Sequence, residues 1–133
     1  KMNTAANEED LDIIINTKRR IKDKPLIVVL EMRNPVVMSE MEPYADVVIA
    51  EFGITKKAVM EAICGSYEPT GLLPLQMPKD METVERQKED VPFDMECYVD
   101  SEGHVWDFGF GMNYSGKIED ERTEKYSYKP QKI

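Results

Sequence analysis

Leu26-Ile27-Val28-Val29-Leu30 is an uninterrupted aliphatic run, rich in β-branched residues, that follows Lys24-Pro25. A run of this length and composition is typical of a strand in a parallel sheet, buried on both faces. Ala45-Asp46-Val47-Val48-Ile49-Ala50 has the same character and predicts a second buried strand. Because crossover connections between such strands have one preferred hand, we expect the two strands to be parallel neighbours.

Helix signals surround both strands. Residues 7–10 are polar and acidic, apolar residues recur at helical spacing from Leu11, and residues 18–22 are mainly basic, which predicts a helix whose ends both suit its dipole. Thr55 is a favourable N-cap for a second helix with an apolar stripe at residues 58–63, and Gly65 can end it. We also expect a helical turn near residues 39–43 and a surface helix near residues 82–88.

A β-hairpin is expected near the C-terminus, where Asp100-Ser101-Glu102-Gly103 forms a turn between residues 95–99 and 104–108. The order of elements predicts an α/β fold, a layered sandwich with a small, mainly parallel sheet flanked by helices, plus this hairpin. We place one domain at residues 1–118 and a polar, loosely packed tail at residues 119–133.

Composition excludes several classes of function. The net charge of −9 disfavours nucleic acid as a partner, and no apolar run could span a membrane. Residues 1–10 lack the apolar core of a signal peptide, so we expect a cytoplasmic protein or a targeting segment encoded further upstream. Cys64 lies in an apolar helical stretch and is expected to be buried, and two cysteines do not indicate a disulfide framework.

Two motifs point to a family. Tyr67-Glu68-Pro69-Thr70-Gly71-Leu72-Leu73-Pro74 is a rigid turn, followed by Met77-Pro78, and Phe108-Gly109-Phe110-Gly111-Met112-Asn113-Tyr114 lies further on. In this order and spacing they resemble the C-terminal domain of glycoside hydrolase family 3, the β-glucosidase and β-xylosidase family. The resemblance extends over residues 11–118 and implies the latter part of an α/β sandwich that has about six strands in the family.

The resemblance implies a non-catalytic part of a retaining β-glycosidase that hydrolyses O-glycosidic bonds. The family's aspartate nucleophile belongs to an N-terminal barrel. Its acid/base residue, where the C-terminal domain supplies it, lies in a loop upstream of the helix at Leu11, so no catalytic residue is assigned. The implied partners are that barrel and, through it, a carbohydrate substrate. No cofactor or metal is implied. The compartment would be periplasmic or extracellular if the longer protein carries a signal peptide, and cytoplasmic otherwise.

One departure from the family concerns the loop after the second strand. The family commonly has Trp-x-Pro-Gly-Gln-Glu-Gly-Gly before the next helix, whereas this chain has the shorter Glu51-Phe52-Gly53-Ile54-Thr55. Ligands of open α/β sheets bind beyond the carboxyl ends of the strands. Glu31, Arg33 and Asn34 follow the first strand and are therefore the candidate substrate-proximal residues.

Other functional interpretations have less support in the sequence. Gly109-Phe110-Gly111 lacks the following helix that a phosphate loop requires. Five carboxylates lie near His104, the only histidine, and could hold a metal, although a solvated hairpin is the favoured interpretation. Asp94 and Glu96 could form a glycosidase pair, but nothing nearby would bury one of them. Methionine is frequent and is expected to fill the core at Met32, Met38, Met41, Met60 and Met77.

An alternative function follows from the small sheet itself. A sheet with two strands exposes an apolar edge, and such an edge can pair with another chain. The alternative is therefore a free-standing α/β interaction module that forms homo-oligomers through this edge.

Overall fold

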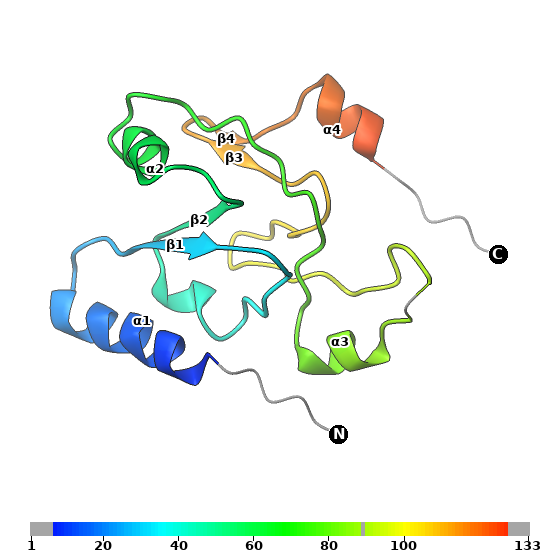
Figure 1. Ribbon diagram of the computed structural model, residues 1–133, viewed down its shortest axis with the longest axis horizontal. Helices are drawn as coiled ribbons and strands as arrows, with labels where there is room; N and C mark the ends of the chain where they lie inside the picture. Colours follow the sequence, from blue (N-terminus) through cyan, green and yellow to red (C-terminus); the bar gives the residue numbers. More distant parts are fainter. Residues whose placement is uncertain (1–6, 89, 128–133) are drawn as a thin grey trace.

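The computed structural model describes residues 7–88 and 90–127. It is an α/β arrangement with a two-stranded parallel sheet, helices and a C-terminal antiparallel hairpin, as the sequence predicts (Figure 1). Helix α1 and helix α2 lie on opposite sides of the sheet in this view.

Helix α1 spans Glu8–Ile21 and precedes the sheet. Acidic residues occupy its first turn and basic residues its last, which complements the helix dipole. Leu11 and Ile14 pack against the core, and Lys18 near the C-terminal end pairs with Asp46 in front of the second strand. The Asp46 carboxylate also accepts the Leu26 N–H at 2.7 Å, so it links the entrances of both strands.

Strands β1 (Ile27–Glu31) and β2 (Val47–Glu51) pair in parallel, with Ile27 opposite Val47 and Glu31 opposite Glu51. The expectation that both faces are buried is wrong. Val28 is buried, whereas Ile27, Val29 and Val47 are 37%, 42% and 48% exposed. The structure covers one face of the sheet with the core and leaves these β-branched side chains of the other face accessible.

Capping residues and a glycine account for where the shorter helices begin and end. A 3₁₀ turn spans Glu42–Tyr44, and α2 spans Lys56–Ile63 with the Thr55 hydroxyl accepting the Ala58 N–H at 3.3 Å. Gly65 takes a φ of +77° just after α2, a conformation that favours glycine. Helix α3 spans Met81–Arg86 and is capped by the Asp80 carboxylate.

The C-terminal half is mostly irregular, with β-type pairing. Val99 and Val105 form an antiparallel bridge across the expected turn, and the backbone N–H of Trp106 donates to the Tyr98 carbonyl at 2.8 Å. A second hairpin that the sequence did not indicate joins β3 (Met112–Asn113) to β4 (Gly116–Lys117). Helix α4 (Glu121–Tyr126) lies within the stretch expected to be a loose tail, of which residues 128–133 are outside the described part.

The core is built from methionine and aromatic side chains. Its buried members are Val28, Met32, Met38, Met41, Leu73, Met77, Tyr98, Trp106 and Phe110. Flexible thioethers fill the space between rigid rings well. Met60 is 54% exposed, so the expectation that it belongs to the core is wrong. Among the described residues, none of the helices has the length and hydrophobicity needed to cross a bilayer.

Candidate functional site

The candidate substrate-proximal residues lie where β1 ends. Glu31 is the last residue of β1, and Arg33 and Asn34 form the bend that follows. All three are exposed, and none of their side chains has a hydrogen-bond or ion-pair partner within residues 7–88 and 90–127. They form a polar edge that is open to a ligand or to another protein surface.

Glu51 organises the neighbouring loop and was not identified as functional from the sequence. Its side chain is buried beside the end of β1, and Oε2 accepts the Gly53 N–H at 2.6 Å and the Ile54 N–H at 2.9 Å. Gly53 takes a φ of +87°. The Glu51 carboxylate thus holds the short loop that follows β2. A Glu placed two residues before a Gly is the sequence feature that could have predicted this contact.

The two motifs lie against each other. Leu73 N–H donates to the Phe110 carbonyl at 2.7 Å, and Gly109 N–H donates to the Leu73 carbonyl at 2.8 Å. A Cβ at Gly111 would lie 2.3 Å from the Gly71 carbonyl oxygen. The two glycine-containing segments therefore act as a close backbone junction, a structural role.

Tyr114, at the end of the second motif, reaches back to α2. Its hydroxyl contacts the carbonyl oxygens of Ala62 and Tyr67, the latter at 2.7 Å. These carbonyls belong to the end of α2 and the start of the first motif. The aromatic motif therefore holds together the helix, the turn and the hairpin.

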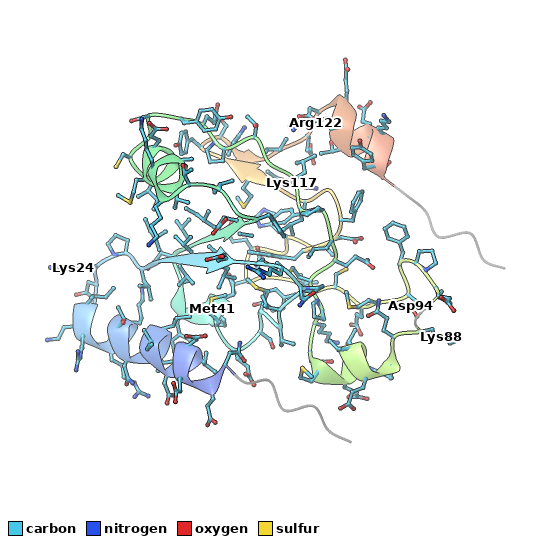
Figure 2. The ribbon with its side chains drawn as sticks, viewed as in Figure 1. Lys24, Met41, Lys88, Asp94, Lys117 and Arg122 are labelled. Atoms are coloured by element: carbon cyan, nitrogen blue, oxygen red, sulfur yellow. The ribbon has the colours of Figure 1, made fainter. Side chains whose placement is uncertain are left out.

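The hairpin carboxylates do not converge. Asp94 accepts the Lys88 N–H at 2.9 Å, a contact at the right of Figure 2, and Glu96 pairs with Lys79 at 2.7 Å. Each carboxylate therefore has its own surface partner. Among the described residues no group of three or more His, Cys, Asp or Glu side chains is arranged to hold a metal.

Asp100 is the most connected carboxylate of the hairpin. Its side chain is 8% exposed and accepts hydrogen bonds from the backbone of Glu102 and His104 and from the Trp106 indole N–H at 3.1 Å. His104 Nδ1 lies 3.1 Å from Oδ2, and the imidazole stacks on Phe110. Burial raises the pKa of Asp100, but these hydrogen bonds outweigh burial and hold the pKa below its ordinary value.

The cysteines are both free. Burial and the nearby Asp107 carboxylate raise the pKa of the Cys97 thiol to about 12, so Cys97 is a poor nucleophile. Cys64 is exposed at the C-cap of α2, so the expectation that it is buried is wrong. The apolar stripe of α2 ends one residue earlier, at Ile63, and Cys64 lies outside it.

A hollow of about 620 Å³ lies between the 105–110 segment and α4. Phe108, Lys117 and Tyr126 line it, together with several carboxylates, and it does not include Glu31, Arg33 or Asn34. The polar edge at the end of β1 is thus an open surface rather than an enclosed pocket.

Comparison with known proteins identifies the family of the chain. Residues 2–114 match the sequence model of the glycosyl hydrolase family 3 C-terminal domain. Probable beta-glucosidase C of Aspergillus oryzae is 37% identical over 91 residues, and beta-glucosidase C of Emericella nidulans is 34% identical over 90 residues, each over 68% of this chain. A periplasmic beta-glucosidase/beta-xylosidase of Dickeya chrysanthemi is 23% identical over 77% of the chain.

The aligned regions make up 13 to 14% of the length of these relatives. No solved structure shows significant similarity to the chain.

Proposed function

The chain belongs to the C-terminal domain family of glycosyl hydrolase family 3, and from this we propose that it serves as a non-catalytic wall of a retaining β-glycosidase site. The observation that carries the proposal is the match over residues 2–114. The partner is an N-terminal barrel that supplies the nucleophile, and the substrate is a β-linked glucoside or xyloside.

The single histidine of the chain supports a non-catalytic role. His104 contacts Asp100 and stacks on Phe110 rather than activating a nucleophile, and Asp94 and Glu96 each have a separate partner. We expect the chain alone to show no turnover of chromogenic β-glucosides or β-xylosides above buffer. Saturable hydrolysis by the purified chain would contradict the proposal.

Glu31, Arg33 and Asn34 are the residues that would contact the sugar or its immediate surroundings. In a chimera, the aligned segment of this chain would replace its counterpart in the Emericella nidulans enzyme, to which it is 34% identical. We expect Arg33→Ala to raise KM by about tenfold, because a charged hydrogen bond contributes about 1.5 kcal/mol. Lys24→Ala, before the opposite end of β1, is the matched control and should leave KM unchanged; equal effects would reject the assignment.

A second candidate is a free-standing interaction module that forms homo-oligomers through its sheet edge. The exposure of Ile27, Val29 and Val47 favours it. Light scattering across a dilution series separates the two candidates. A discrete oligomer that dissociates on dilution supports the interaction module. A monomer at all concentrations leaves only the glycosidase-domain proposal.

A further inference from the structure

The hollow between the 105–110 segment and α4 has the size of a ligand site. Its volume of about 620 Å³ lies within the range of small-molecule pockets in proteins, roughly 300–1,000 Å³. All of its lining residues lie between Val105 and Ser127. Because neither β1 nor β2 contributes to the lining, the hollow does not depend on what covers or extends the sheet.

Two aromatic rings form the apolar part of the hollow. Phe108 and Tyr126 meet at right angles, with 5.7 Å between the ring centroids and 88° between the ring planes. Phe108 also meets the ring of Phe93 edge-on, at 6.2 Å, so it is held by two neighbouring rings. Tyr126 is nevertheless 43% exposed. The hollow therefore presents an aromatic ring that is both supported by packing and accessible to a ligand.

Hydrogen-bond donors and acceptors surround these rings. Lys117 of β4, labelled in Figure 2, supplies donors, and the carboxylates of Glu119 and Glu124 supply acceptors. Lys117 Nζ lies 3.4 Å from the Glu119 carboxylate in an exposed pair, which leaves further bonding capacity on both groups. The Glu124 carboxylate and the Tyr126 hydroxyl have no hydrogen-bond or ion-pair partner within residues 7–88 and 90–127. Several polar groups are therefore available to a ligand.

The charges around the hollow favour a neutral ligand. A cation would meet Lys117, and Lys125 already lies over the Tyr126 ring, with Nζ 5.6 Å from the ring centroid. An anion would meet the carboxylates of Glu119 and Glu124. A hydroxyl group both donates and accepts hydrogen bonds, so a ligand with several hydroxyl groups can bond to the lysine and the carboxylates at once.

We propose that this hollow binds a neutral saccharide. The C–H face of the sugar ring packs on Tyr126, and its hydroxyl groups bond to Lys117, Glu119 and Glu124. The dissociation constant lies in the millimolar range, because the hollow is open and the ligand is small. The proposal does not rest on the role of the chain as a wall of a glycosidase site, and its failure would leave that role intact.

Titration of the isotope-labelled full chain with cellobiose, followed by the NMR shifts of its backbone amides, tests the proposal. At about 20 mM sugar, well above a millimolar dissociation constant, we expect saturable shifts within residues 105–110 and 117–127. Tyr126→Ala and Glu124→Ala should each raise the dissociation constant about fivefold or more. Glu124→Ala keeps the ring pair, so it separates a lost ligand contact from altered packing of α4. Tyr44→Ala, an exposed tyrosine outside the hollow, is the matched control and should leave the dissociation constant unchanged.

Choline and inorganic phosphate test the charge argument in the same assay. We expect neither ion to shift the amides that line the hollow. An absence of shifts with cellobiose would overturn the proposal, as would tighter binding of choline or phosphate. Affinity that is unchanged in both variants would overturn it too. Shifts confined to residues 31–34 would also overturn it, and would instead support the proposed role of the polar edge at the end of β1.

Discussion

Gly111 marks the tightest approach between the two motifs. A Cβ there would lie 2.3 Å from the Gly71 carbonyl oxygen and 2.9 Å from Leu72 Cδ2, and the first of these is backbone that cannot move independently. We therefore expect Gly111→Ala to lower the free energy of unfolding by about 3 kcal/mol, measured by urea denaturation. Gly71→Ala is the matched control, because its Cβ would meet nothing within 4 Å. Equal stabilities of the two variants would contradict the close junction.

Asp100 makes a pH-dependent contribution to stability. Its pKa is lower in the folded chain than in the unfolded chain, so its contribution is present above the unfolded pKa and is lost as pH falls through the folded pKa. We expect Asp100→Asn to lower the free energy of unfolding by about 2 kcal/mol at pH 7 and by much less near pH 2. Urea titrations at both pH values measure this, with Glu102→Gln as control. A difference independent of pH would contradict it.

At the scale of elements, the sequence predicted features that depend on neighbouring residues better than features that depend on tertiary packing. Thr55, Gly65 and the charge distribution of α1 predict helices because caps and dipoles act within a few residues. Whether one or both faces of β1 are buried could not be inferred from the strand itself, since it depends on what covers the sheet. The β3–β4 hairpin has two residues per strand, too few for a periodic pattern. The roles of Glu51 and Tyr114 arise from contacts that sequence spacing does not reveal.

Helix α2 depends on a tyrosine from the distant second motif. The Tyr114 hydroxyl contacts the Ala62 and Tyr67 carbonyls at the end of this helix. We expect Tyr114→Phe to lower the free energy of unfolding by about 1 kcal/mol and to speed amide hydrogen exchange at residues 60–67. Tyr44→Phe is the control, because the Tyr44 hydroxyl has no partner in the described part of the chain. Unchanged exchange at α2 would show that the helix is held by its own packing.

At the scale of the whole molecule, the position of the domain boundary is open to a direct test. We propose that the domain ends near Ile118 and that α4 is an accessory element. Arg122 donates to the Thr70 carbonyl at 2.7 Å, and Tyr126 meets the Phe108 ring edge-on at 5.7 Å. These contacts join α4 to both motifs, yet α4 has no buried residue. An edge-on ring pair contributes about 1 kcal/mol, and the hydrogen bond of an exposed guanidinium contributes little.

Deleting residues 119–133 should therefore leave a chain that folds cooperatively, with a free energy of unfolding lower by about 1 kcal/mol, mainly through the lost ring pair. Arg122→Ala alone should account for only a small part of that loss. Urea denaturation followed by the fluorescence of Trp106, the single tryptophan, measures both. Loss of the cooperative transition would place the boundary beyond Ile118, because the core formed by Met77, Trp106 and Phe110 would then require α4. Unchanged stability would instead show that α4 contributes nothing to the folded state.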